Sequence, residues 1–411
     1  MSHGPRIVRL DQLVIRPGSL WARLPLYAGA VGVLFTVISV VLATGSEENA
    51  KQFFHSWLVA VIFFLSIGLG CLFFVLIHHA AKAGWGVVVR RLAENLACAV
   101  PLLALLFIPV VFYGMYDLFH WTHADAVAHD RLLQGKQPWL NESGFWLRAV
   151  VYFAVWTGLA LFFRNASRRQ DASGDEALSR RMARFSPPAI ALFALTLTFA
   201  GFDWLMSLEP HWYSTMFGVY FFAGAIVSAL AALTVLTLLL ESAGYFRGVI
   251  TGEHLHDLGK LLFAFTVFWA YIAFSQFFLI WYANIPEETN WFLSRLHGTP
   301  DNPANWRPAT LLLAIGHFAI PFFFLMPRTI KRNRALLMVG ALWMLGMHFW
   351  DVFWLVMPNL HREMSFSFLD LTSLLGVGGL FVAVVTWLLG RGALLPTRDP
   401  RLVESLAFEN I

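Results

Sequence analysis

Apolar residues occur along this chain in ten blocks of about 20 residues, separated by short polar stretches. A helix of that length spans the hydrocarbon core of a bilayer, and a backbone in lipid must satisfy its own hydrogen bonds. Each block therefore predicts a transmembrane helix rather than a strand. The ten predicted helices cover residues 25–44, 56–79, 95–116, 145–164, 186–206, 215–241, 260–283, 308–327, 335–356 and 368–390. Pro101, Pro109 and Pro321 lie inside predicted helices and predict kinks there.

Lys and Arg are distributed unequally between the two sides that ten helices define. With the N-terminus in the cytoplasm, the segments on that side carry 22 of the 29 basic residues. By the positive-inside rule, this bias predicts that both termini are cytoplasmic. The chain then divides into a cytoplasmic N-terminal segment (1–24), a ten-helix membrane domain (25–390) and a cytoplasmic tail (391–411). The longest external loops, 117–144 and 284–307, are expected to cover the helix ends or to meet a partner.

Composition excludes several classes of protein. Of the 411 residues, 58% are hydrophobic and only 13% are charged, which excludes a set of soluble domains. A net charge of +4, with basic residues scattered between apolar blocks, speaks against nucleic-acid binding. The two cysteines, Cys71 and Cys98, form no CxxC or CxxCH motif, so the chain ligates no cluster through four thiolates and attaches no c-type haem.

Two of the predicted helices resemble each other. Asp203 lies seven residues before Pro210, Asp351 lies seven residues before Pro358, and both acids are surrounded by aromatic residues. These two helices are the fifth and the ninth, so they run in the same direction. The pattern predicts two parallel four-helix bundles, helices 2–5 and 6–9, flanked by helices 1 and 10. Chance similarity between aromatic-rich helices is the alternative.

Ionisable residues inside membrane spans are expensive and therefore mark candidate functional sites. Asp203 lies toward the outer side, as do His348 and Asp351, which share one helix face, while His317 lies near mid-membrane. Four further candidates are on the inner side: Glu241, His256, Asp257 and Lys260. Histidines and buried acids titrate in the right range for a proton path, which this series predicts. For Asp203 the alternative is that it satisfies exposed backbone near a helix end. For the inner run the alternative is a solvated loop in which Asp257 caps a helix. For His317 the alternatives are a packing role, or one bis-histidine haem bound together with His348.

Three segments resemble a known family. Residues 202–220 (FDWLMSLEPHWYSTMFGVY), residues 254–284 with the following 285–288 (IPEE), and the region 348–351 are similar to membrane subunits of alternative complex III. That assembly is a bacterial quinol:cytochrome c oxidoreductase with two ten-helix subunits of the NrfD/polysulfide-reductase type. The chain looks like the second of these subunits, and the resemblance extends over all ten helices.

The resemblance implies a subunit of an electron-transport complex of the respiratory chain, in the bacterial inner membrane. Haem and iron–sulfur clusters would be bound by partner subunits only, and this chain would carry no redox centre of its own. The implied partners are a paralogous ten-helix subunit, an iron–sulfur protein and c-type cytochromes, with a terminal oxidase as a further candidate. Whether the chain itself takes part in catalysis is left open. Quinone or quinol is the expected ligand, with Asp117, His120 and Gln276 as candidate contacts, and the ionisable series above would conduct protons.

Two other functions remain open at this point. A secondary transporter can also have ten helices and polar residues near the midplane, although the apparent parallel repeats speak against it. A purely structural scaffold is the third possibility.

Overall fold

The computed structural model describes residues 12–300 and 302–409. Within this part of the chain, ten helical segments are long and apolar enough to cross a membrane, as predicted, so the protein is an all-α polytopic membrane protein. The spans are α1 (Leu20–Ala43), α2 (Glu47–Ala80), α3 (Val87–Ala97) with α4 (Val100–Phe112), α8 (Glu142–Ser173), α9 (Glu176–Trp204), α10 (Phe217–Ser242), α11 (Gly252–Ala283), α13 (Arg307–Leu312) with η4 (Leu313–Ala319) and α14 (Ile320–Leu325), α16 (Arg334–Val356), and α17 (Phe368–Leu389). Residues 1–11 of the predicted segment 1–24, and 410–411 of the predicted tail, lie outside the described residues.

Most helices extend beyond the apolar runs that predicted them. Their first turns are polar and are stabilised by side chains that accept a hydrogen bond from a free backbone N–H. Asp175 caps α9 in this way, so that α9 begins ten residues before the predicted start at residue 186 and carries Pro187 inside it. Apolar composition therefore located the membrane-spanning part, while the caps determine where each helix begins.

Two of the three prolines that predicted kinks lie at an irregularity, while the third, Pro109, lies inside α4, which continues past it to Phe112. The third span is interrupted at Cys98–Ala99, just before Pro101, so that it consists of α3 and α4. In the eighth span, residues 313–319 form a π-helix directly before Pro321. Proline lacks the N–H that would bond to the carbonyl four residues earlier, and π-helical turns absorb such a disruption while rotating nearby side chains. The π-helix contains His317, one of the candidate site residues.

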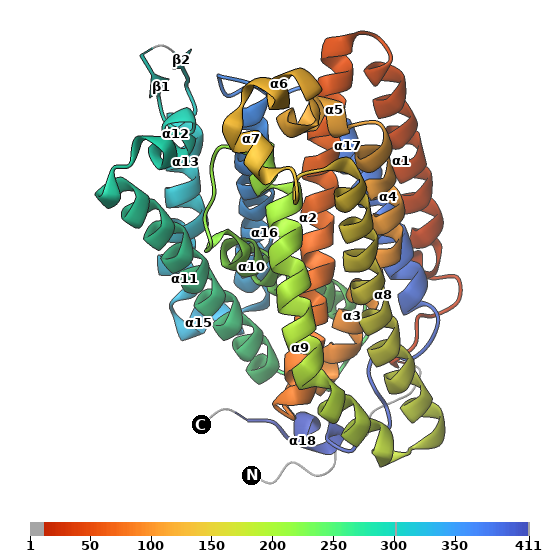
Figure 1. The fold of residues 1–411 in the computed structure, drawn as a ribbon. Helices are drawn as coiled ribbons and strands as arrows, with labels where there is room; N and C mark the ends of the chain where they lie inside the picture. Colours follow the sequence, from red (N-terminus) through yellow and green to blue (C-terminus); the bar gives the residue numbers. More distant parts are fainter. Residues whose placement is uncertain (1–11, 301, 410–411) are drawn as a thin grey trace.

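The ten spans form two four-helix bundles and a flanking pair, as predicted (Figure 1). In the first bundle α2, α3–α4, α8 and α9 pack around one another, and in the second α10, α11, η4–α14 and α16 do so. The central helices α2 and α10 join the two bundles. The flanking helices α1 and α17 pack against each other and together lie beside α2.

Small residues allow the central and the flanking helices to approach closely. A Cβ on Gly70 of α2 would lie 2.1 Å from the Ala225 carbonyl oxygen of α10, and one on Gly32 of α1 would lie 2.5 Å from the Leu380 nitrogen of α17. Close backbone approach of this kind is the usual source of helix association in lipid, where apolar side chains gain nothing by leaving an apolar solvent. The join between the two bundles thus depends on glycine at residue 70.

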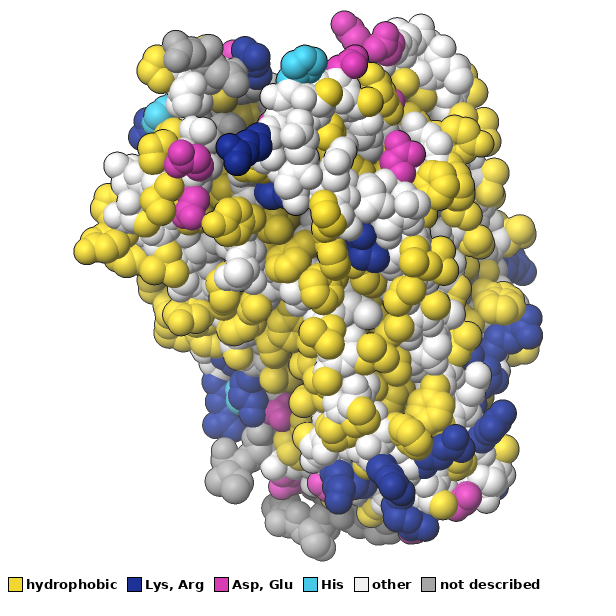
Figure 2. All heavy atoms as spheres, viewed as in Figure 1, with side chains coloured by type: hydrophobic (Ala, Val, Ile, Leu, Met, Phe, Trp, Pro, Cys, Tyr) yellow, Lys and Arg dark blue, Asp and Glu magenta, His cyan; other side chains and the backbone are white. Residues whose placement is uncertain are grey.

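Short elements cover the end of the molecule opposite to that at which the described chain begins, at Gln12, and ends, at Glu409 (Figure 1). Between α4 and α8 these are α5 (Met115–Leu118), η2 (His120–Thr122), α6 (Ala124–His129) and α7 (Arg131–Lys136). Between α11 and α13 they are α12 (Pro286–Ser294) and a hairpin of β1 (Gly298–Thr299) and β2 (Asn302–Pro303). The remaining short helices are η3 (Met206–Leu208), α15 (Arg328–Arg332), η5 (Met357–Asn359) and α18 (Leu402–Leu406). Figure 2 shows hydrophobic side chains across the middle of this face and Lys and Arg gathered near the end that holds the termini.

A buried ionic network holds the C-terminal tail against α3. Arg90 Nη2 donates to Asp399 at 2.5 Å, and Arg91 donates to Glu94 at 2.8 Å and to Asp171 of α8 at 2.7 Å. The side chains of both arginines are at most 3% exposed. Sequence reasoning used these arginines only as orientation signals. The structure shows that they also attach the tail to two helices of the first bundle.

Candidate functional site

Asp351 lies buried in α16, where aromatic donors from two other helices hold it. The Tyr220 hydroxyl of α10 donates to Oδ1, and the Trp269 indole N–H of α11 donates to Oδ2 at 3.0 Å. Among the described residues, the one basic side chain within ion-pair distance of Asp351 is His348, whose Nδ1 lies 4.0 Å from Oδ2. This acid thus sits in the second bundle without an arginine or lysine to neutralise it. Such a group can exchange a proton with a neighbour, because neither of its charge states is fixed by a permanent cation.

His348 links Asp351 to the centre of the protein. It lies one helical turn before Asp351 on the same face of α16, as the sequence predicted, and its Nε2 is 2.7 Å from Ser66 Oγ of α2. Gly224 of α10 leaves room for the imidazole, since a Cβ there would lie 2.9 Å from His348 Cε1. The bond to Ser66 fixes the orientation of the ring, so that Nδ1 remains the nitrogen on the Asp351 side.

His317 completes the cluster. Its ring packs on Trp269 with centroids 3.8 Å apart, and neither ring nitrogen has a hydrogen-bond partner among the described residues. One donor or acceptor atom each from His317, His348 and Asp351 lie within 4.8 Å of one another. The three atoms are therefore close enough to surround one water molecule or one small ion. A water at that point would let the three side chains share a proton.

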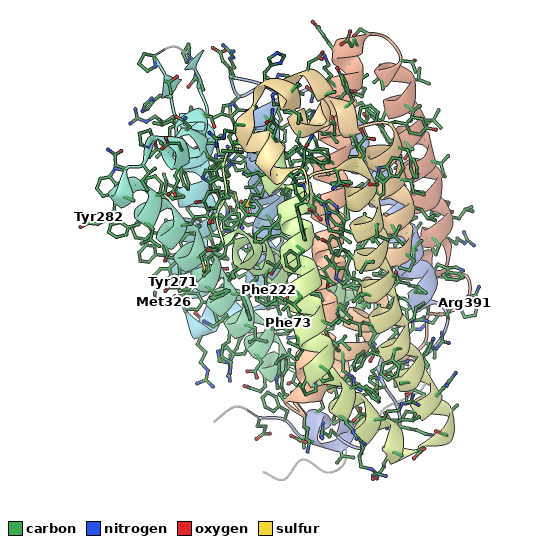
Figure 3. The ribbon with its side chains drawn as sticks, viewed as in Figure 1. Phe73, Phe222, Tyr271, Tyr282, Met326 and Arg391 are labelled. Atoms are coloured by element: carbon green, nitrogen blue, oxygen red, sulfur yellow. The ribbon has the colours of Figure 1, made fainter. Side chains whose placement is uncertain are left out.

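A cavity of about 600 Å³ adjoins this cluster, between α10, α11, α12, η4 and α16. Its wall is largely aromatic and includes Tyr220 and Trp269, the two residues that donate to Asp351. Tyr271 and Phe274, also in the wall, are more than 60% exposed on the outer face of α11. Figure 3 shows Tyr271 on this outward-facing side of the second bundle. The cavity thus connects the lipid-facing surface of α11 with the residues that hold Asp351.

A buried arginine forms part of the cavity wall. Arg295 is 2% exposed, and its guanidinium stacks on Trp291 at 3.7 Å and lies 5.4 Å from the Trp354 ring. It donates to backbone carbonyls, among them that of Leu355 at 2.9 Å, while its Nε has no partner among the described residues. Burial lowers the pKa of Arg295 to about 9, which still leaves it charged at neutral pH. A buried cation without a carboxylate is costly, so its presence favours a ligand with a polar oxygen.

Of the three residues predicted to contact quinone, the structure places one at this cavity. Gln276 lies in the wall, where its Oε1 accepts from Ser214 Oγ at 3.1 Å. Asp117 in α5 and His120 in η2 belong to the cap of the first bundle and do not line the cavity. Burial raises the pKa of Asp117 above its usual value. The sequence placed all three residues toward the outer side of the membrane. Depth alone, however, does not say which of the two bundles a residue belongs to.

Asp203 occupies a different environment from Asp351. In the first bundle it accepts from Trp139 at 2.8 Å, from Tyr152 at 2.8 Å, and from two nitrogens of Arg148 at 2.7 and 3.0 Å. Both acids thus receive a tyrosine hydroxyl and a tryptophan N–H, but only Asp203 also receives an arginine. The predicted resemblance between the two helices extends to these partners.

The predicted inner residues lie near the end that holds the termini and form ion pairs of their own. Glu241 accepts from two nitrogens of Arg334 at 2.6 and 2.9 Å, and Lys260 lies 2.5 Å from Asp257. His256 is buried at the start of α11, close to that second pair in sequence. His256, Asp257 and Lys260 lie in the first turns of α11, whereas Asp351 is bonded to Trp269, farther along the same helix, so the structure groups the predicted path into separate sites.

Sequence reasoning missed four residues of the site: Ser66, Tyr220, Trp269 and Arg295. The first three carry no charge, so the search for expensive ionisable groups in spans passed over them. Arg295 was counted only among the basic residues of the outer loops, although it follows Trp291 in an aromatic-rich segment that could have marked a cation held by rings.

Comparison with protein-family models and with curated proteins finds no match to this chain. What the site does must therefore be inferred from its own residues.

Proposed function

We propose that this chain is an integral membrane subunit of a quinol:cytochrome c oxidoreductase of the alternative complex III type. It binds quinol in the aromatic cavity and accepts a quinol proton at Asp351. The resemblance of residues 202–220 and 254–288 supports membership in the complex. One observation carries the proposed site: Tyr220 and Trp269 line the cavity and also donate hydrogen bonds to Asp351. A ligand in the cavity would thus be separated from a buried acid only by the residues that hold that acid.

The cavity has the chemistry that a quinone head group needs. A quinone is a flat apolar ring with oxygens on opposite sides, and sites for such molecules combine apolar walls with a few placed donors. Here aromatic side chains supply the walls, and Arg295 and Gln276 supply charged and neutral donors. The exposed position of Tyr271 on α11 gives a long isoprenoid tail access to the membrane.

The proton chemistry follows from the arrangement around Asp351. Oxidation of one quinol releases two protons and two electrons, and the electrons pass to redox centres in partner subunits. Asp351 accepts one proton through the Tyr220 hydroxyl, which lines the cavity and donates to it, and His348 and His317 share that proton. The other proton leaves the cavity directly to the outer side. Asp203, Glu241, His256, Asp257 and Lys260 remain predictions as further members of a path.

The gathering of Lys and Arg near the termini supports the proposed orientation, with the termini in the cytoplasm and the cavity toward the outer side (Figure 2). Quinol protons would then leave on the outer side of a bacterial inner membrane.

Copurification tests membership in the complex. A tag on this chain should bring down c-type cytochromes, an iron–sulfur protein and a second ten-helix subunit under mild detergent. A chain that purifies alone or as a homo-oligomer would support the transporter alternative instead.

The variant Asp351→Asn tests the role of the site within that assembly. The change keeps the volume and an acceptor oxygen for Tyr220 or Trp269, but removes the exchangeable proton. Quinol:cytochrome c turnover or proton release should fall while subunit composition stays the same. Asp370→Asn is a matched control, because Asp370 is also buried and bonded to a hydroxyl and an amide, those of Ser56 and Gln52, and does not line the cavity. Unchanged turnover together with unchanged proton yield in Asp351→Asn would exclude the proposed role.

A further inference from the structure

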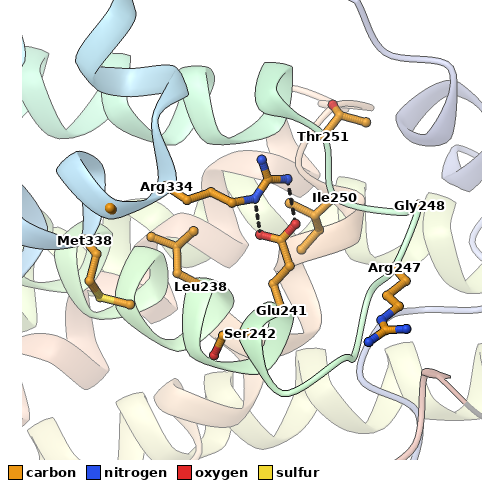
Figure 4. A pocket seen from close by; sticks show the side chains of 10 residues that line it. Leu238, Glu241, Ser242, Arg247, Gly248, Ile250, Thr251, Arg334 and Met338 are labelled. Carbon is orange, nitrogen blue, oxygen red and sulfur yellow. Dashed lines mark hydrogen bonds and ion pairs between the residues drawn. The ribbon is translucent and has the colours of Figure 1, made fainter.

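A second, independent cavity of about 760 Å³ opens near the end of the molecule that holds the termini. The last turn of α10, the loop that follows it and the first turn of α16 surround it (Figure 4). Its wall contains three charged side chains: Glu241, Arg247 and Arg334. The remaining wall is largely apolar and includes Leu238, Ile250 and Met338.

The charges in this cavity do not cancel. The carboxylate of Glu241 accepts hydrogen bonds from two nitrogens of Arg334, so these two charges neutralise each other (Figure 4). Arg247 is exposed and has no ion-pair or hydrogen-bond partner among the described residues. Two arginines facing one glutamate leave one positive charge, and the unpaired arginine is the group that can receive an anion.

The cavity continues into a lipid-facing surface. Along α16, directly beyond the cavity, Val339 is 56% exposed and Leu342 is 52% exposed, and Leu239 of α10 is 44% exposed. Apolar side chains that remain this exposed in a membrane protein face acyl chains. The arginines therefore lie where the apolar surface ends, at the level expected for lipid phosphates.

We propose that this cavity binds the head group of an anionic phospholipid, with its phosphate at Arg247 and its acyl chains along α16. Charge complementarity and the continuous apolar surface both favour a lipid over a free phosphate, because a free phosphate would gain nothing from Leu238, Met338 or the exposed residues above them. The site does not depend on the quinol cavity, which lies in a different part of the second bundle.

Native mass spectrometry of the purified protein in its native assembly tests this proposal. The probes are phosphatidylglycerol, phosphatidylcholine and soluble glycerol 3-phosphate. Phosphatidylglycerol should bind more tightly than phosphatidylcholine, and Arg247→Gln should weaken it about fivefold, the factor expected for one arginine near an anionic lipid. Ala335→Phe, which fills the cavity without changing charge, should also weaken it.

Arg169→Gln is the matched control, since Arg169 is exposed near the end of α8 and does not line the cavity. Equal affinity for the two lipids, or equal loss in Arg247→Gln and Arg169→Gln, would overturn the proposal. Competition by glycerol 3-phosphate at the same concentration as the lipid would also overturn it, because the ligand would then be a free phosphate.

Discussion

The ion pair of Asp203 and Arg148 should carry a large share of the stability of the first bundle. The Asp203 carboxylate is 1% exposed and accepts four hydrogen bonds, two of them from Arg148. Removing one partner of a buried pair leaves the other charge uncompensated, which costs about 3–5 kcal/mol. Arg148→Met should therefore lower the unfolding temperature by roughly 5 °C for a chain of this length. Fluorescence-detected size exclusion after heating measures this change.

The double variant Arg148→Met with Asp203→Asn separates a lost contact from a stranded charge. Because it removes the buried charge as well, it should be more stable than Arg148→Met alone. Lys51→Ala is the control for an exposed pair: Lys51 and Glu47 are 42% and 84% exposed, so no measurable change is expected. The reasoning is refuted if Arg148→Met unfolds within about 1 °C of the unmodified protein, or if the double variant is the less stable of the two.

Three further predictions follow from the same contacts. Gly224→Ala should reduce quinol turnover roughly tenfold without loss of assembly, because its Cβ would displace the ring of His348. Gly346→Ala in α16 is the control, since its Cβ meets open space and should leave turnover unchanged. Equal turnover in the two variants would contradict this prediction. Arg295→Met should raise the quinol KM about tenfold, because it removes a charged donor from the cavity wall, and should not lower the unfolding temperature. Steady-state kinetics measure the KM, and a melting curve measures the unfolding temperature. Arg91→Met should cost about 3 kcal/mol, seen as unfolding at lower temperature, because it leaves Asp171 without its arginine and the buried Glu94 with Arg90 alone. An unchanged melting curve would count against that network.

The ten spans could be predicted from the sequence because lipid offers no hydrogen-bond partners to the backbone. A long apolar run in lipid must be a helix, so the number and order of the spans follow from composition. Helix ends were less accurate, since α9 begins at a cap, Asp175, that lies well outside the apolar run. The pairing of His348 with Asp351 was predictable because both lie on one helix, where spacing fixes their relative positions.

The rest of the site depends on contacts between helices, which spacing along one helix does not give. Tyr220 and Trp269 reach Asp351 from two other helices, and nothing in their own segments indicates this. His317 was placed by counting residues at the rise of a regular helix, but a π-helix surrounds it and changes the direction of its side chain. Arg295 was missed for a different reason. In a predicted loop, an arginine is interpreted only by the positive-inside rule, and the fold is needed to show that Trp291 covers its guanidinium.

The central claim is that a quinol in the aromatic cavity acts on Asp351, and infrared difference spectroscopy of the purified complex tests it most directly. Addition of quinol should change a carboxyl stretching band in the unmodified protein and in Asp370→Asn. The same band should be missing from the difference spectrum of Asp351→Asn. A spectrum that is identical in all three proteins would show that the ligand does not act on Asp351, and would contradict the account.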